Sequence, residues 1–239
     1  MSRGKFAANG VYVNPDPRFF RVAAVCSVLS AVTTLLLIFL PQWFLPVQGF
    51  EDRMARIDES AYQVRSWVYL LHPFLVFAAA LGLALAVWRR APVLAIGALA
   101  GFALWAFTEA GQQTMTLFAF DRWRAAWATA DAATRKTIQI NAAMYDGLWD
   151  GMYMLLLIGF AIGNACLGAA LWKNGGLQRA VSGFLWAACA LTVALFIGEL
   201  GLQVVPEVAL RWAYPALQPL GRTLTGIWLW HHAAARPAD

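Results

Sequence analysis

The sequence predicts an all-α, polytopic transmembrane helical bundle, and two observations carry this prediction. Of the 239 residues, 61% are hydrophobic and only 13% are charged, whereas a soluble globular domain carries about 25% charged residues. The apolar residues also fall in blocks of about 20 or more, the length that a helix needs to cross a hydrocarbon core of roughly 30 Å. Such a chain cannot hide its apolar surface in water. We therefore expect residues 1–239 to form one membrane domain with the lipid bilayer as solvent.

Six apolar blocks predict six spanning helices. They cover residues 22–45, 67–88, 92–118, 148–172, 181–204 and 212–230. The first block is too long for the h-region of a signal peptide and no small-x-small cleavage site follows it, so a retained helix is expected. The last block contains Pro215, Pro219 and Arg222. A re-entrant or surface-lying helix is therefore the alternative to a sixth span.

The joints between the blocks alternate in kind. Arg89-Arg90-Ala91 and residues 173–179 are short, basic turns. Residues 46–66 and 119–147 are longer and mix both charges, which predicts an amphipathic surface helix in each. Because Lys and Arg crowd the ends of helices on the cytoplasmic side, we expect both termini in the cytoplasm and both long loops outside.

Ionisable side chains inside the apolar blocks are candidates for function, because they are costly in a membrane. They are His72, Glu109, Asp146, Asp150, Glu199 and Arg222. If the helices alternate as expected, His72, Glu109, Asp150 and Glu199 lie within roughly 5–15 Å of the outer membrane boundary. The sequence thus predicts a buried His/carboxylate site in the outer half of the bundle.

The spacing of these residues supports a shared polar cavity. On three helices a carboxylate has a second polar group one turn away: Asp146 with Asp150, Glu109 with Gln113, and Glu199 with Gln203. Arg222 is the expected counter-ion of Glu199 or Glu109. We assign catalytic roles to Glu109, Asp150, Asp146 and Glu199. We assign ligand contacts to His72, Trp105, Gln112, Gln113, Tyr153, Gln203 and Arg222.

Structural interpretations compete with these roles. Asp146 and Asp150 suit a helix N-terminus, where acids are favoured. Glu199 and Arg222 suit a buried ion pair. His72 precedes Pro73, which would open the spanning helix and leave His72 at a junction.

Other classes of function have little support. Cys26, Cys166 and Cys189 form no CxxC motif, and the Glu-x-x-His repeats of di-iron bundles are missing, so we predict no metal site and assign no cofactor. The net charge of +5 is not gathered in a basic tract, so no nucleic-acid partner is expected.

The second half of the chain also carries a resemblance. It rests on Gly159-Phe160-Ala161-Ile162-Gly163 through Gly168 to Leu171-Trp172-Lys173, on Leu177-Gln178-Arg179 with Gly183, and on Ile227-Trp228-Leu229-Trp230. From about Tyr145 onward the chain resembles a family of uncharacterised bacterial multi-pass membrane proteins with about six helices. The resemblance implies a spanning sixth helix and a bacterial inner membrane, and no activity. The last helix of that family often carries an acid where this chain has Arg222.

These observations lead to three hypotheses. The first is a site that binds a small or lipid-like ligand and does acid–base chemistry on it, as an isomerase or cyclase would, with Glu109 and an aspartate as proton donor and acceptor. The second is a small proton-coupled carrier, against which stand the short chain and the lack of an obvious inverted repeat. The third is a non-enzymatic assembly or accessory subunit.

Overall fold

The computed structural model describes residues 16–173, 175–202 and 205–235, and the regular elements in this part of the chain are all helices. Five helices are long and apolar enough to cross a membrane. They are α1 (Pro17–Phe39, continued by η1, Leu40–Trp43), α3 (Ser60–Val87), α4 (Pro92–Met115), α6 (Ala132–Leu171) and α7 (Leu177–Glu199). A further long helix, α8 (Glu207–Ala234), is less apolar. The chain is thus a multi-pass helical membrane protein, as its composition predicts.

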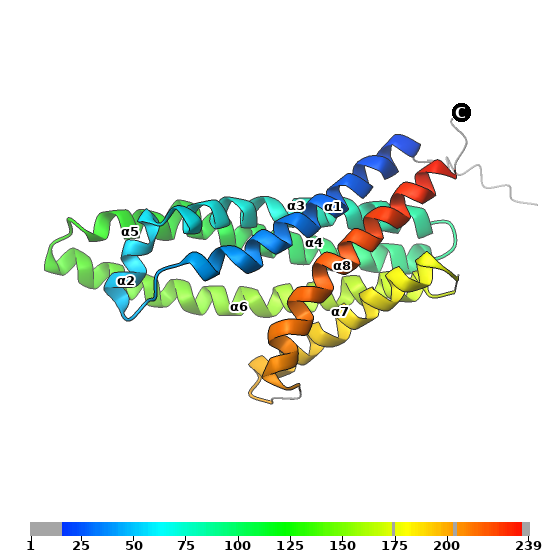
Figure 1. Cartoon of the computed structure of the whole chain (residues 1–239). Coiled ribbons are helices and arrows are strands. Elements are labelled where there is room, and N and C mark those ends of the chain that lie inside the picture. The colour runs from blue at the N-terminus through cyan, green and yellow to red at the C-terminus, as the bar shows by residue number, and fades with distance from the viewer. Residues whose placement is uncertain (1–15, 174, 203–204, 236–239) are drawn as a thin grey trace, which may run out of the picture.

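The helices form one elongated bundle (Figure 1). Helices α3, α4 and α6 run side by side, and α1 and α8 pack against each other across them. The C-terminal part of α7 and the first turns of α8 leave the bundle together. The second half of α8 therefore lies along α1 within the bundle.

Glycines permit two of these close approaches. A Cβ atom on Gly101 would lie 2.5 Å from the backbone nitrogen of Gly163 and 2.7 Å from the carbonyl oxygen of Gly159. Backbones of α4 and α6 thus touch, as small residues allow in membrane helices. A Cβ atom on Gly226 would lie 3.0 Å from the carbonyl oxygen of Ala24, which sets α8 directly on α1.

Both long loops contain helical segments, as expected, although neither loop forms one long surface helix. The first contains a short α2 (Phe50–Ala55) and a 3-10 turn, η2 (Arg56–Asp58). In the second, a π-helical turn, η3 (Thr116–Phe120), and the short α5 (Asp121–Trp127) follow α4 without a break, and α6 already begins at Ala132. The Asp131 side chain caps α6 by accepting a hydrogen bond from the Thr134 N–H. No Gly or Pro interrupts residues 132–146, so α6 runs for 40 residues.

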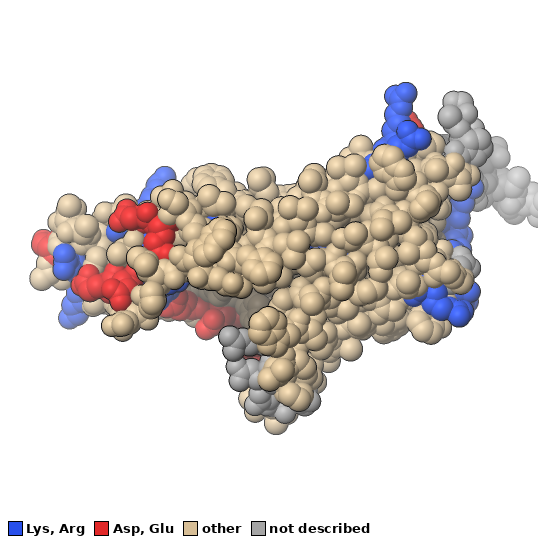
Figure 2. All heavy atoms as spheres, viewed as in Figure 1, with Lys and Arg blue, Asp and Glu red and all other residues tan. Residues whose placement is uncertain are grey.

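On the face of the bundle shown in Figure 2, charged side chains gather toward the two ends and leave a mostly apolar middle. At the end where α1 and α7 begin, the described cations are Arg18, Arg21, Arg89, Arg90, Lys173 and Arg179. We call this the basic end. The opposite end, formed by α2, α5 and the start of α6, mixes both signs. The two ends of the bundle therefore differ in charge.

Candidate functional site

His72 lies inside α3 and not at the start of a helix. Because α3 already begins at Ser60, the interpretation of Pro73 as the residue that opens the span is wrong. Pro73 sits in the helix interior, where it supplies no backbone N–H. The His72 side chain is only 3% exposed, so both of its ring nitrogens need partners within the protein.

Both nitrogens of His72 have partners, and these fix its tautomer. The Arg222 Nη1 lies 2.7 Å from the His72 Nε2, and because a guanidinium only donates, Nε2 must accept. The proton is therefore on Nδ1, which lies 2.7 Å from the Thr33 Oγ1. The Thr33 hydroxyl donates in turn to the Ser30 carbonyl at 3.0 Å. A directed chain of hydrogen bonds thus runs from α8 through α3 to α1.

The same contacts hold Arg222 in place. Its carbonyl oxygen accepts a hydrogen bond from the Ser27 hydroxyl at 2.7 Å, which fixes this turn of α8 against α1. Its Nη2 lies 3.5 Å from the Gln218 Oε1, one turn earlier on α8. Three helices therefore position one guanidinium.

Arg222 forms part of the wall of a partly open, narrow cavity of about 60 Å³. Residues of α1, α3, α4, α6, α7 and α8 all line this cavity. Most of the wall is apolar, with Val76 and Leu83 from α3, Phe102 from α4 and Phe160 from α6. Among the described residues that line it, Arg222 carries the only charge.

The polar groups in the cavity wall differ in whether their hydrogen-bond donors already have partners. The hydroxyl groups of Ser30 and Thr225 donate to the backbone carbonyls of Ser27 and Gly221. The Nε2 of Gln218, by contrast, is buried without a hydrogen-bond partner among the described residues. A buried amide that donates to nothing costs roughly 1–3 kcal/mol. Gln218 and Arg222 thus offer an acceptor group of a ligand a place to bind.

The cavity is closed toward the basic end. Beyond Leu83, a layer of fully buried apolar side chains fills the bundle. It consists of Ala84, Val87, Leu167, Leu171, Val181 and Leu229, each 0% exposed. The cavity is therefore a blind pocket in this conformation and not a path through the bundle.

Four of the residues singled out from the sequence lie together around this arrangement. Trp105, 4% exposed, packs edge-on against His72 with ring centroids 6.1 Å apart. Glu109, also 4% exposed, lies one turn further along α4, within electrostatic range of Arg222 and Arg65. Of these four residues only Arg222 lines the cavity, and His72 connects it to Trp105 through the contacts given above.

The other predicted carboxylates lie elsewhere. Counted from the basic end at about 1.5 Å per residue, His72 and Glu109 lie about 25 Å along their helices, whereas Asp150 and Glu199 lie about 33 Å along theirs. Both are exposed. Asp146 pairs with Arg53 through contacts of 2.7 and 2.5 Å at the mixed-charge end, and this hydrogen bonding raises the pKa of the Arg53 guanidinium.

The remaining predicted ligand contacts are dispersed. Gln112 is buried and donates to the Trp149 carbonyl at 3.0 Å, which joins α4 to α6. Gln113 is also buried, and Tyr153 is half-buried within electrostatic range of Glu199. Gln203 lies outside the described residues.

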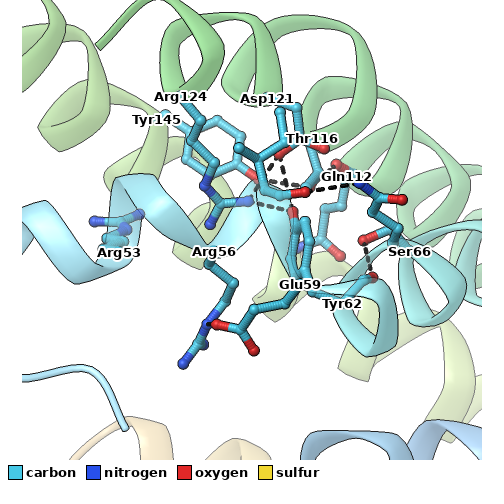
Figure 3. A network of polar contacts seen from close by, with 12 residues as sticks. Arg53, Arg56, Glu59, Tyr62, Ser66, Gln112, Thr116, Asp121, Arg124 and Tyr145 are labelled. Atoms are coloured by element: carbon cyan, nitrogen blue, oxygen red, sulfur yellow. Dashed lines mark hydrogen bonds and ion pairs between the residues drawn. The ribbon is translucent and has the colours of Figure 1, made fainter. Parts of the chain in front are cut away.

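Sequence reasoning missed a second polar network, shown in Figure 3. Arg124 is 8% exposed and lies 2.7 Å from the Asp121 Oδ1, and it also contacts the Tyr62 hydroxyl. Tyr62 donates to the same Asp121 oxygen at 3.0 Å, so the network joins α3 to α5. The i, i+3 spacing of Asp121 and Arg124 was the available signal. No cavity among those described opens here, and we assign the network a structural role.

Comparison of the chain with models of protein families, with curated proteins and with solved structures finds no match. The resemblance of the second half to a family of bacterial membrane proteins therefore gains no support from these comparisons. Within the described residues, no three His, Cys, Asp or Glu side chains lie close enough together to hold a metal ion.

Proposed function

We propose that this membrane protein binds an anionic, lipid-like molecule in the blind cavity between its helices. The anionic group would lie at Arg222 and the Gln218 amide, and the apolar part against the α3, α4 and α6 walls. The observation that carries the proposal is a single guanidinium, held by His72 at 2.7 Å, in the wall of an otherwise uncharged and mostly apolar cavity. Charge-assisted hydrogen bonds are about twice as strong as neutral ones.

Binding is favoured over the other hypotheses. The carboxylates Asp146, Asp150 and Glu199 are not in the cavity wall, so the acid–base pair that an isomerase or cyclase needs is not assembled there. A carrier needs access to its site from both sides of the membrane, and the layer beyond Leu83 closes one side. The geometry therefore supports a binding protein best.

The proposal includes an orientation. We propose that α8 is a sixth span, because its second half packs along α1 and contributes Arg222 to the interior. The basic end would then face the cytoplasm, with both termini there. The donor end of the cavity would lie nearer the outer face than its apolar floor does.

A thermal unfolding experiment tests the proposal. The protein in phosphatidylcholine nanodiscs would be heated with increasing laurate or with dodecanol, its uncharged counterpart. We expect laurate to raise Tm far more than dodecanol, and Arg222→Gln to abolish that difference. Arg53→Gln, which removes a cation at the mixed-charge end, should respond as the natural protein does. Equal effects of laurate and dodecanol would overturn the proposal.

A further inference from the structure

We propose that the cavity accepts one single-chain amphiphile of medium length, and that Leu83 and the packed layer behind it set the limit of that length. This inference rests on the proposed function, since it names the class of molecule that the same cavity would take. It would make Leu83 a specificity-determining residue.

The positions of the hydrogen-bond donors in the wall set the direction of a bound ligand. The strongest donors of the wall, Arg222 and Gln218, lie toward the outer end, and Leu83 lies furthest toward the basic end along α3. A ligand anchored at Arg222 would therefore extend its apolar chain toward Leu83. This is the direction of a lipid in the outer leaflet, with its head outward and its tail toward the membrane centre.

The face of α3 that lines the cavity sets the length of ligand that fits. Val76, Ala79, Ala80 and Leu83 lie on one face of α3 and all line the cavity. From Val76 to Leu83 the helix rises about 10 Å. The wall is thus long enough for a medium-length chain and too short for a long one.

Leu83 and the packed side chains behind it form the floor of the cavity. Leu83 is 3% exposed, and the side chains of Ala84 and Val87 behind it are 0% exposed. Well-packed interiors do not accept extra methylene groups without strain. A chain that reaches Leu83 must therefore stop or fold back. The cavity is also narrow, at about 60 Å³, which disfavours a two-chain phospholipid.

The energetics give a measurable signature. Each buried methylene group improves affinity about fourfold until the chain reaches the floor. Beyond that length, the gain should stop and affinity should fall. The expected profile is a maximum within a series of carboxylic acids and not a steady rise.

The test is a binding series from octanoate through decanoate, laurate and myristate to palmitate. Binding to the protein in phosphatidylcholine nanodiscs would be measured by native mass spectrometry and corrected for partition into empty nanodiscs. We expect a maximum at a medium chain length, a shift to longer acids in Leu83→Ala, and a shift to shorter acids in Leu83→Phe. Leu29→Ala, on the exposed face of α1, is the matched control and should leave the maximum in place.

The outcomes separate the two proposals. If acids bind and depend on Arg222, but affinity rises steadily to palmitate or the maximum ignores both Leu83 variants, the length limit is wrong and the proposed function stands. If no acid binds at any length, both fail. Because Leu83→Phe adds volume and Leu83→Ala removes it, a folding defect in one variant leaves the other to decide.

Discussion

The Nη1 of Arg222 lies 2.7 Å from the Nε2 of His72, although 150 positions separate the two residues in the sequence. This contact joins α8 to α3, and through Thr33 to α1. The neutral imidazole accepts one hydrogen bond of the guanidinium. The position of Arg222 in the cavity therefore depends on His72.

Removing His72 should weaken the fold as well as the site. We expect His72→Leu to lower the free energy of unfolding by roughly 1–3 kcal/mol, because Arg222 and Thr33 both lose a buried hydrogen-bond partner. Chemical unfolding in detergent measures this change. In a double-mutant cycle with Thr33→Val the two effects should not add, since the residues share one hydrogen bond. Strict additivity would show that the contact carries no coupling energy.

The contact between α4 and α6 gives a matched pair of glycine substitutions. A Cβ atom on Gly101 would meet backbone atoms of Gly163 and Gly159, whereas one on Gly147 would have no neighbour within 4 Å. We expect Gly101→Ala to destabilise the protein by about 1–3 kcal/mol through overpacking. Gly147→Ala should be neutral or stabilise it by about 0.5–1 kcal/mol, because alanine is the better helix former. In thermal unfolding, the Tm of Gly101→Ala should therefore fall, whereas the Tm of Gly147→Ala should stay the same or rise. Equal losses would count against the close packing of these helices.

The sequence predicts the class of fold well and the site only in part. Hydrophobic block length predicts α1, α3, α4, α6 and α7 as spans, because the bilayer sets that length. The same counting cannot show that α6 extends far beyond the apolar region, since the amphipathic pattern of residues 119–147 predicts a separate surface helix there. The continuation depends on the Asp131 cap and on the absence of a helix breaker.

The candidate site, like the fold, could be predicted from the sequence only in part. The rarity of charge in the apolar blocks points to His72, Glu109 and Arg222, which the structure brings together. Asp150 and Glu199 carry the same signal but lie about 8 Å further along their helices, counted at 1.5 Å per residue. A depth estimate from sequence is coarser than this difference. The cavity, and the Gln218 Nε2 that has no hydrogen-bond partner among the described residues, depend on the packing of six helices, which no local pattern encodes.

Asp146 lies outside the cavity wall, so its substitution should not affect ligand binding. Its ion pair with Arg53 is partly exposed, with side chains 45% and 30% accessible, and pairs of this kind contribute about 0–1 kcal/mol. We expect Asp146→Asn to change the unfolding free energy by no more than that and to leave laurate binding unchanged. Unfolding curves at low and high salt, with the laurate titration, measure both. A loss of laurate binding would restore Asp146 to the site.

Acid should weaken the start of α6. Hydrogen bonds from Thr134 lower the pKa of Asp131, the N-cap of this helix. A carboxylate with a depressed pKa stabilises the fold fully above its unfolded pKa and loses that contribution as the pH falls through its folded pKa. We expect Asp131→Ala to be less stable than the natural protein near neutral pH and to converge with it in acid. Thermal unfolding across that range would show convergence, and a constant gap would contradict the cap.

Photo-crosslinking tests the central claim most directly. Laurate with a diazirine near the end of its chain would be activated on the protein in nanodiscs, and the labelled peptides mapped by mass spectrometry. We expect label on the cavity-lining stretch of α3 between Val76 and Leu83, on Phe102 or on Phe160, and we expect Arg222→Gln to lose this label. Label confined to lipid-facing residues such as Val28 and Leu29, and unchanged in Arg222→Gln, would contradict the claim.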